Sequence, residues 1–298
     1  MQTEDPKLKS GMKVTIVGAI VNIFLVIIKL YFGFIGRSQA LVADGIHSLS
    51  DLFSDAVVLL GLNWGAKDAD DNHPFGHGRI ETVSALVIGL LLIAVAVGIV
   101  YKSVQTLYHH EPVQPTIWTI LAAFVSIVLK EILYHYTVYI GKKHKSLVIV
   151  ANAWHHRTDA FSSIAVLIGI TGAYLNPNWV YADALASLFV TYFIVKVGWE
   201  LIWQALKEVV DTAPDEEVLQ LIRAISERID GVLNAHDIKA RYSGGRIITE
   251  VHIVVDKNLS VFEGHTIAKN VEYTLIDEID ELVKVIVHVD PSDNKIIH

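Results

Sequence analysis

Apolar residues run in six long stretches through the first two thirds of the chain. At about 1.5 Å per helical residue, each stretch is long enough to cross a hydrocarbon layer about 30 Å thick. The pattern therefore predicts a transmembrane domain of six helices over residues 14–206, preceded by a polar tail at residues 1–13. The six stretches are Val14–Phe34, Ala40–Leu62, Val83–Tyr101, Thr116–Ile140, Leu147–Tyr174 and Trp179–Leu206.

The basic residues between these stretches lie mostly on one side of the predicted membrane. They occur in the N-terminal tail, in the second-to-third and fourth-to-fifth connections and after the sixth stretch, whereas the other connections hold only Arg37 and Lys102. Because cytoplasmic loops are enriched in lysine and arginine, both termini are expected in the cytoplasm, with the protein in a plasma or inner membrane. The first stretch is too long for a signal-peptide core, so we expect it to be retained.

The pattern changes in residues 207–298, where helical and alternating segments are short and mixed. A hairpin is predicted by two strand-like runs joined by Ser243-Gly244-Gly245. The predicted order is αββαβ, a small cytoplasmic α+β domain that would suit a dimer partner. Its elements are a helix after Pro214, strands at His236–Tyr242 and Arg246–Val255, a helix at Ser260–Ile279 and a strand at Val283–Val289.

The composition supports a membrane protein, and it limits both the class of partner and the residue types that could bind a metal. The chain is 52% hydrophobic with a mean hydropathy of +0.44. Its net charge of -8 argues against a nucleic-acid partner, which would need clustered positive charge. The imbalance belongs to the last 92 residues, which hold 10 Lys and Arg against 18 Asp and Glu. Cysteine is absent, so any metal site must use imidazole and carboxylate.

Two predicted helices carry a histidine and an aspartate four residues apart. These pairs are His47 with Asp51 and His155 with Asp159, and the spacing places each pair on one helix face. A charge deep in a bilayer costs about 2.5–3.5 kcal/mol on insertion scales, which favours a functional role over a passive one. Facing each other, the pairs would offer two nitrogens and two oxygens, a set that suits tetrahedral Zn²⁺. The alternative is a pair of buried hydrogen bonds that hold helices together.

Asp44 and Asp55 extend the face that carries His47 and Asp51. Each could be an outer hydrogen-bonding partner of a metal ligand, a charge at the mouth of a cavity, or an ordinary residue at the membrane interface.

Polar clusters also occur outside the predicted helices. The segment 68–79 holds three carboxylates and two imidazoles, which could bind a divalent ion or form a solvated loop. Apart from the terminal His298, four histidines lie in the C-terminal domain, a number that favours a metal site in a chain without cysteine. His288 and Asp290 lie two apart on a predicted strand and so share a face. The others are His236, His252 and His265.

Several ordered motifs, spread over nearly the whole chain, resemble those of the cation diffusion facilitator family. This resemblance implies a homodimer of six-helix membrane domains with a metallochaperone-like cytoplasmic domain, exporting divalent cations in exchange for protons. The motifs are ADGIHSLSD, DDNHPFGHG, NAWHHRTDA, GVLNAHDIKAR, EVHIVV, EGHTIA and VIVHVDP.

The resemblance also assigns residues. Its transport site falls on the two intramembrane pairs and its loop site on Asp70, His73 and His77. A charge interlock, meaning an ion pair between the loop and the end of the sixth helix, falls on Arg79 and Asp211. The family's cytoplasmic two-metal site corresponds to His236, His252, His288 and Asp290, with His265 in support. One departure is Val289, where some relatives carry a polar group.

The sequence is compatible with more than one transported metal and with more than one class of function. Imidazole and carboxylate favour zinc, yet iron, manganese, cobalt or cadmium export by the same route is compatible with the affinity order of divalent metals. A membrane-anchored metal sensor or scaffold would bind metal without flux. An intramembrane metallohydrolase would need a motif such as HExxH, which the sequence lacks. Zinc bound between two acidic C-terminal domains could also regulate a dimer.

Overall fold

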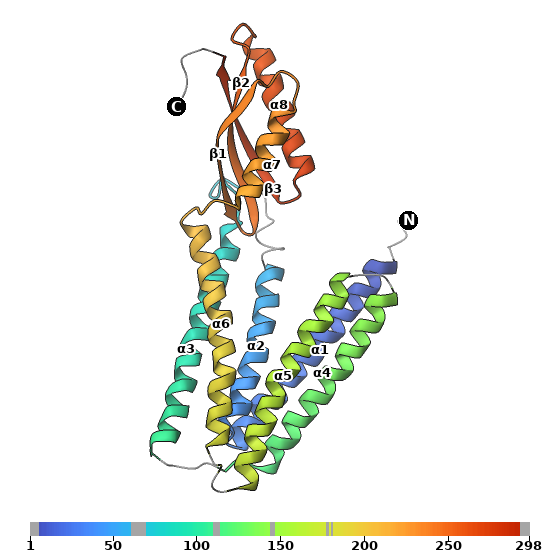
Figure 1. Cartoon of the computed structure of the whole chain (residues 1–298), viewed down its shortest axis with the longest axis vertical. Coiled ribbons are helices and arrows are strands. Elements are labelled where there is room, and N and C mark those ends of the chain that lie inside the picture. The colour runs from blue at the N-terminus through green and yellow to red at the C-terminus, as the bar shows by residue number, and fades with distance from the viewer. Residues whose placement is uncertain are drawn as a thin grey trace. The chain divides into compact units, whose positions relative to one another are not determined.

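The structure is a computed structural model that describes residues 6–60, 70–109, 114–143, 147–176, 179 and 181–292. It has a helix at each of the six predicted stretches (Figure 1). Counting only residues that the structure describes, four segments are long and apolar enough to cross a membrane, namely Ile16–Ile35, Arg79–Tyr108, Ile117–Lys143 and Ala182–Val209. The six helices are α1 (Pro6–Ile35), α2 (Gln39–Leu60), α3 (Arg79–His109), α4 (Ile117–Lys143), α5 (Leu147–Leu175) and α6 (Ala182–Val209).

Several helices are longer than the apolar stretches that predicted them. The first begins at Pro6, within the tail expected at residues 1–13, and α3 continues to His109. Hydropathy marks the part of a helix that suits hydrocarbon, whereas the backbone hydrogen bonds continue into polar sequence. Proline at the first helical position is compatible with this start because its missing N–H has no partner there anyway.

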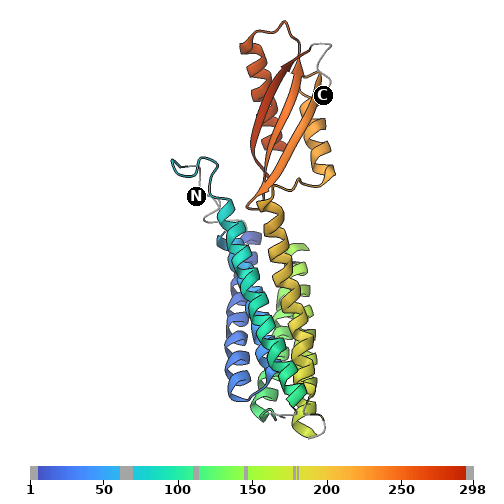
Figure 2. The ribbon, with the colours of Figure 1, turned by 90° about the vertical axis from the view of Figure 1, so that its left-hand side faces the viewer.

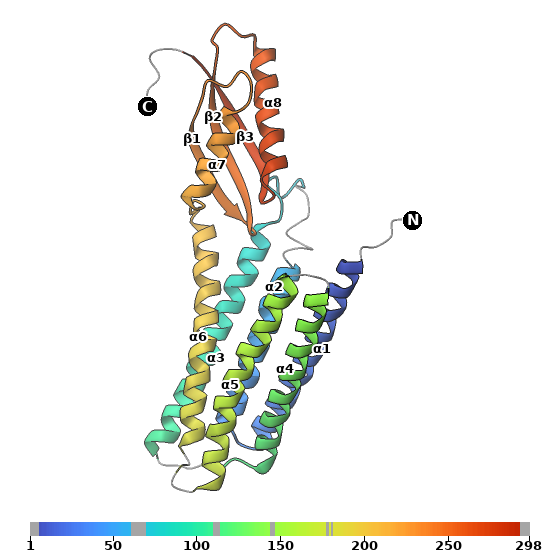
Figure 3. The same ribbon diagram turned by 45° about the vertical axis from the view of Figure 1, so that its right-hand side comes forward.

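The chain divides into two compact units, which are described separately. The first unit is Met1–Ala56 with Val87–Leu201, and the second is Val57–Leu86 with Ile202–His298. In the first, α4 packs along α5 and α1 packs against α4 (Figures 1 and 3). Alanines such as Ala43 and Ala123 are fully buried between helices, where small side chains allow close approach. Large apolar side chains including Phe24, Leu91 and Trp118 point outward, as lipid contact requires.

The start of α2 is fastened to the start of α6 by Asp183, which is buried. Its carboxylate accepts hydrogen bonds from the Ser38 hydroxyl at 2.5 Å and the Gln39 amide at 2.7 Å. A carboxylate at a helix N-terminus satisfies amides that have no intrahelical partner. This contact fixes the position from which α2 carries its histidine and aspartates into the bundle.

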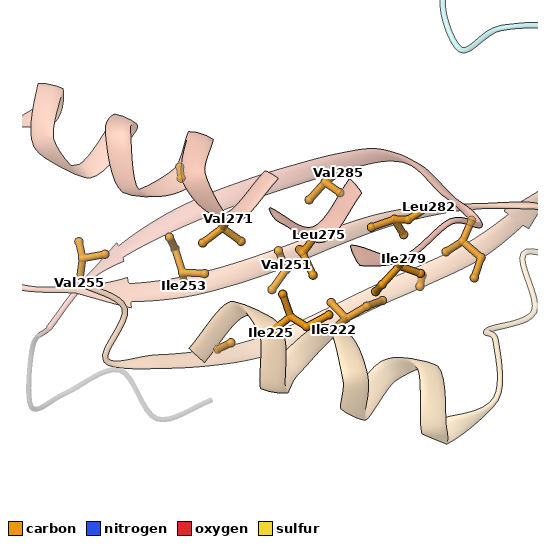
Figure 4. Packing of buried hydrophobic residues seen from close by; sticks show 14 residues of the cluster. Ile222, Ile225, Val251, Ile253, Val255, Val271, Leu275, Ile279, Leu282 and Val285 are labelled. Atoms are coloured by element: carbon orange, nitrogen blue, oxygen red, sulfur yellow. The ribbon is translucent and has the colours of Figure 1, made fainter. Parts of the chain in front are cut away.

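The C-terminal domain has the predicted αββαβ order, and the predicted fold class is confirmed. The β-hairpin is antiparallel, β3 pairs with β2 in parallel, and the sheet order is β1-β2-β3. Both helices cover one face of the sheet (Figure 2), and residues such as Ile222, Val251 and Leu275 fill the space between (Figure 4). The elements are α7 (Glu216–Glu227), β1 (Asn234–Ser243), β2 (Arg246–Val255), α8 (Val261–Glu278) and β3 (Leu282–Pro291).

A capping box formed by Ser260 and Glu263 stabilises the start of α8. The Ser260 hydroxyl accepts from the Glu263 amide at 3.2 Å, and the Glu263 carboxylate accepts from the Ser260 amide at 2.7 Å. The carboxylate also accepts from the Ser260 hydroxyl at 2.7 Å, and the bonds it accepts from the Ser260 backbone amide and hydroxyl hold the pKa of Glu263 below its ordinary value. The ionised Glu263 carboxylate therefore contributes its full stabilisation of α8 above the ordinary glutamate pKa. This stabilisation is lost as the pH falls through the lowered pKa.

Ser260→Ala should destabilise α8 by about 1 kcal/mol at neutral pH. Amide hydrogen exchange across α8 in the full chain measures this change. The difference between the two proteins should shrink when the pH falls below the lowered pKa of Glu263. Equal exchange of the two proteins at neutral pH would contradict the assigned cap.

Candidate metal centres

The first cluster lies within the helical bundle, where α2 meets α5. His47 and Asp51 come from α2 and Asp159 from α5, and one ligand atom from each lies within 4.8 Å of the others. His47 and Asp159 are buried, with 8% and 6% of their surfaces exposed. His155 lies one turn before Asp159 on α5, and its side chain is outside the described part of the chain. The structure therefore brings together three of the four residues predicted for the transport site.

The His47 ring has an environment that suits a ligand. Its Nδ1 atom is buried and has no hydrogen-bond partner among the described residues. The ring lies 5.9 Å, centroid to centroid, from Phe193 of α6, which shields it from one side. Since a buried ring nitrogen normally finds a partner, this atom is open to an incoming cation.

Two lysines that the sequence reasoning missed lie buried in the same bundle. Lys29 of α1 is fully buried with its Nζ 2.7 Å from Asp44, and Lys130 of α4 is 2% exposed with its Nζ 3.1 Å from Asp159. A lone lysine in the middle of an apolar stretch is costly and therefore a signal in itself. Window-averaged hydropathy hides such a residue, which is why neither lysine was singled out.

Asp44 forms the ion pair with Lys29. Its side chain is only 1% exposed, so it is not an ordinary residue at the membrane interface. It also accepts a hydrogen bond from the Ser163 hydroxyl of α5 at 2.9 Å, and the Lys29 ammonium donates to the Ser48 and Ser163 hydroxyls. This arrangement ties α1, α2 and α5 together beside the cluster. The side chain of Asp55 lies outside the described residues.

The second cluster is the loop group Asp70, His73 and His77. The two carboxylate oxygens of Asp70 lie 3.1 Å from His73 Nδ1 and 3.2 Å from His77 Nε2. Hydrogen bonds donated by the His73 backbone amide, with further help from the His73 ring and the Asn72 amide, hold the pKa of Asp70 below its usual range. A carboxylate kept ionised beside two imidazoles can accept a divalent cation without first losing a proton.

The third cluster lies on the sheet face that the helices leave uncovered. The strand register places His236 opposite His252, and His252 opposite His288, so three histidines cross three strands in one row. Asp290 lies two residues beyond His288 on the same face. Its oxygens lie 3.1 Å from His252 Nδ1, 3.3 Å from His288 Nε2 and 3.6 Å from His236 Nε2.

Asp237 also reaches this cluster, although strand alternation would place it on the other face. The β1 ladder is irregular between His236 and Lys239, and Asp237 has a positive φ of 44°. A bulge of this kind turns a side chain toward a site, and the Asp237 carboxylate lies 3.7 Å from His252 Nε2. The hydrogen bond from the Lys239 ammonium holds the pKa of Asp237 below its ordinary value.

His265 does not lie with the third cluster. It is exposed on α8, and the buried residues Val251 and Ile253 show that α8 covers the opposite face of β2 from His252. Glu250, which the sequence reasoning did not single out, lies on the same face as His252 with an oxygen 4.0 Å from Nε2.

The loop and the C-terminal domain are connected within the second unit by two carboxylates. Asp211 accepts from Arg79 at 2.6 Å and from Arg241 at 2.9 Å, so the contact predicted from Arg79 and Asp211 gains a third member. Glu208 is buried, and it accepts from the Thr82 hydroxyl at 2.5 Å and from the Gly244 amide at 3.1 Å. Glu208 thus fastens the β1–β2 turn to the start of α3.

Glu208→Ala should loosen this connection more than Asp211→Ala. Removing the buried acceptor strands its donors at about 1–3 kcal/mol, whereas exposed ion pairs are worth about 0–1 kcal/mol. We expect amide exchange at Gly244 to rise about tenfold or more in Glu208→Ala and less than about fivefold in Asp211→Ala. The opposite order would show that the exposed ion pairs, and not Glu208, hold the turn.

Comparison with known proteins identifies the two parts of the chain. Residues 15–210 match the family model described as the cation efflux transmembrane domain, and residues 214–292 match that of the cation efflux protein cytoplasmic domain. The chain belongs to the cation diffusion facilitator family. The second match, to a dimerising domain, supports a homodimer. This cation diffusion facilitator is an integral membrane protein that exports divalent metal cations.

Individual relatives span nearly the whole chain. An uncharacterized transporter of Methanocaldococcus jannaschii is 35% identical over 94% of this chain and 98% of its own length. The manganese efflux system protein MneP of Bacillus subtilis is 34% identical over 94% of this chain and 95% of its own. Among solved structures, a cadmium form of a variant MamM C-terminal domain is 28% identical and covers 26% of this facilitator and 98% of that chain, with a TM-score of 0.26.

Proposed function

We propose that this protein exports a divalent cation, with zinc as its main substrate, by exchange for protons at His47, Asp51, His155 and Asp159. The observation that carries the proposal is the convergence of His47, Asp51 and Asp159 inside the helical bundle. Two carboxylates and a buried imidazole whose Nδ1 atom has no partner among the described residues offer a divalent cation both oxygen and nitrogen ligands.

Proton exchange follows from the chemistry of these ligands. An imidazole must be neutral and a carboxylate ionised to bind metal, so protons and metal compete for the same atoms. An inward-facing site would load the cation, the helices would then open outward, and protons would displace it. No separate proton relay is needed in this scheme.

Zinc is favoured by the donor set, in which His155 supplies the second imidazole. Two nitrogens and two oxygens suit a tetrahedral ion, whereas manganese prefers carboxylate, carbonyl and water oxygens. Manganese is the second candidate, because a relative 34% identical to this chain is named a manganese efflux protein. We place both termini in the cytoplasm, as the distribution of lysine and arginine indicates.

The cytoplasmic cluster would sense the exported metal. Three of the candidate ligands converge on one sheet face of an acidic domain, namely His236, His252 and Asp290. His288 lies 3.3 Å from Asp290 and Asp237 lies 3.7 Å from His252, so both would complete the set. In a homodimer, metal bound there would reduce the repulsion between two acidic domains and draw them together. The loop cluster of Asp70, His73 and His77 would hold a second cytosolic ion.

Metal-resolved flux in proteoliposomes with an imposed pH gradient tests the proposal. We expect zinc to move against its own gradient when the pH gradient is present, with protons moving in the opposite direction, and manganese to move more slowly. Zinc binding without flux would instead support a metal sensor. Faster flux of manganese than of zinc would assign manganese as the substrate.

A further inference from the structure

The Lys130 ammonium lies against one of the proposed metal ligands. Its Nζ atom is 3.1 Å from Oδ2 of Asp159, and the side chains are only 2% and 7% exposed. Lys130 comes from α4 and Asp159 from α5, and these two helices pack along each other (Figure 3). The ammonium of Lys130 is therefore paired with the same carboxylate that would bind a metal in the transport site.

We propose that Lys130 is a tethered cation that competes with the transported metal for Asp159 and so sets the affinity and release rate of the site. This inference rests on the proposed function, because it takes Asp159 to be a ligand. When metal binds, the ammonium must leave the Asp159 oxygen. When metal departs, the ammonium returns and prevents immediate rebinding.

Charge supports this role. Without metal, the Lys130 ammonium offsets the negative charge of Asp159. With a divalent ion bound, the same ammonium becomes a like charge within a few ångströms of it. At an effective dielectric constant of about 20, the repulsion at contact distance is too large for the ammonium to stay there, so it must move away as the metal binds. The cost of moving it weakens metal binding.

The competition also favours divalent over monovalent cations. A sodium or potassium ion that displaced the ammonium from Asp159 would exchange one unit charge for another. A divalent ion adds one positive charge and can satisfy both carboxylates. Lys130 thus raises a barrier that abundant monovalent ions do not overcome.

A comparison with Lys29 separates this role from that of an ordinary helix contact. Lys29 pairs with Asp44 and donates to the Ser48 and Ser163 hydroxyls, at 3.0 and 3.1 Å. Its carboxylate partner lies outside the group of His47, Asp51 and Asp159 whose ligand atoms converge. Lys29 and Lys130 are equally buried, so Lys29 provides a matched control.

The test measures zinc binding and zinc flux for Lys130→Met in the full-length protein at pH 8. All proteins carry His77→Ala and His252→Ala, so that the loop and cytoplasmic clusters do not obscure the intramembrane site. We expect Lys130→Met to bind zinc about tenfold to a hundredfold more tightly, and its maximal flux to fall about fivefold or more because release is slow. Lys130→Arg, which keeps the charge, should restore both quantities to within about threefold of the parent.

Two controls distinguish a failure of the Lys130 proposal from a failure of the proposed transport site. Lys29→Met should not tighten zinc binding as Lys130→Met does, and equal tightening would overturn a specific role for Lys130. If Lys130→Met binds zinc more weakly or unchanged while Asp159→Asn abolishes binding, Lys130 is only a helix contact and the inference is wrong. If Asp159→Asn leaves binding and flux intact, the proposed transport site itself is wrong.

Discussion

Asp159→Asn should abolish zinc transport, lowering flux by about a hundredfold or more. The substitution keeps the shape of the side chain but removes the ionised oxygen that would bind metal, and it leaves the buried Lys130 ammonium without its carboxylate. Flux into proteoliposomes under an imposed pH gradient measures the effect. Asp51→Asn should give a loss of similar size, because both carboxylates belong to one converging group.

Glu200→Gln provides the matched control for this loss. Glu200 is also an acidic residue on a membrane helix, but its side chain is 63% exposed and lies 3.8 Å from Lys196. Its substitution should leave flux within about twofold of the parent. Transport that survives in both aspartate variants would show that metal crosses the membrane by another route.

His252→Ala should remove metal binding from the cytoplasmic domain. His252 is on the central strand and lies beside both neighbouring histidines, with ring centroids 5.5 Å from His236 and 4.5 Å from His288. Loss of a central ligand should weaken binding about a hundredfold, since even outer partners of a metal cost about 10–100-fold when removed. Zinc titration of the full chain with a competing chelator measures this affinity.

His265→Ala is the control for the cytoplasmic site. It replaces a histidine of the same domain that is exposed on α8, beyond the opposite face of the sheet. The affinity for zinc should not change. Equal losses in the His252 and His265 variants would contradict the cluster, because they would show that both faces of the sheet contribute to binding.

Periodicity in the sequence predicted most of the fold and part of each candidate site. The i, i+4 spacing of His47 and Asp51 was sufficient to place both on one face of α2, and the alternation in β2 was sufficient to place His252 opposite the core. These features depend only on local geometry. Periodicity did not show which helix the His47 face of α2 meets. The family resemblance supplied that assignment.

Other features depend on tertiary contacts that periodicity does not encode. Lys29 and Lys130 lie in stretches whose average hydropathy is high, and only the packing of α1 against α2 and of α4 against α5 shows that each faces an aspartate. Asp237 reaches the cytoplasmic cluster through a bulge, which breaks the alternation on which a strand prediction depends. His265 was grouped with the strand histidines by its residue type and by the family resemblance, neither of which shows which face of the sheet α8 covers.

The central claim is that one zinc ion binds among His47, Asp51, His155 and Asp159. X-ray absorption at the zinc edge tests it most directly, using the full-length protein with His77→Ala and His252→Ala so that the other clusters are weakened. The account predicts one zinc per chain with four nitrogen and oxygen neighbours at about 2.0–2.2 Å, two of them imidazole. This signal should disappear in Asp159→Asn. An unchanged zinc signal in Asp159→Asn would contradict the account.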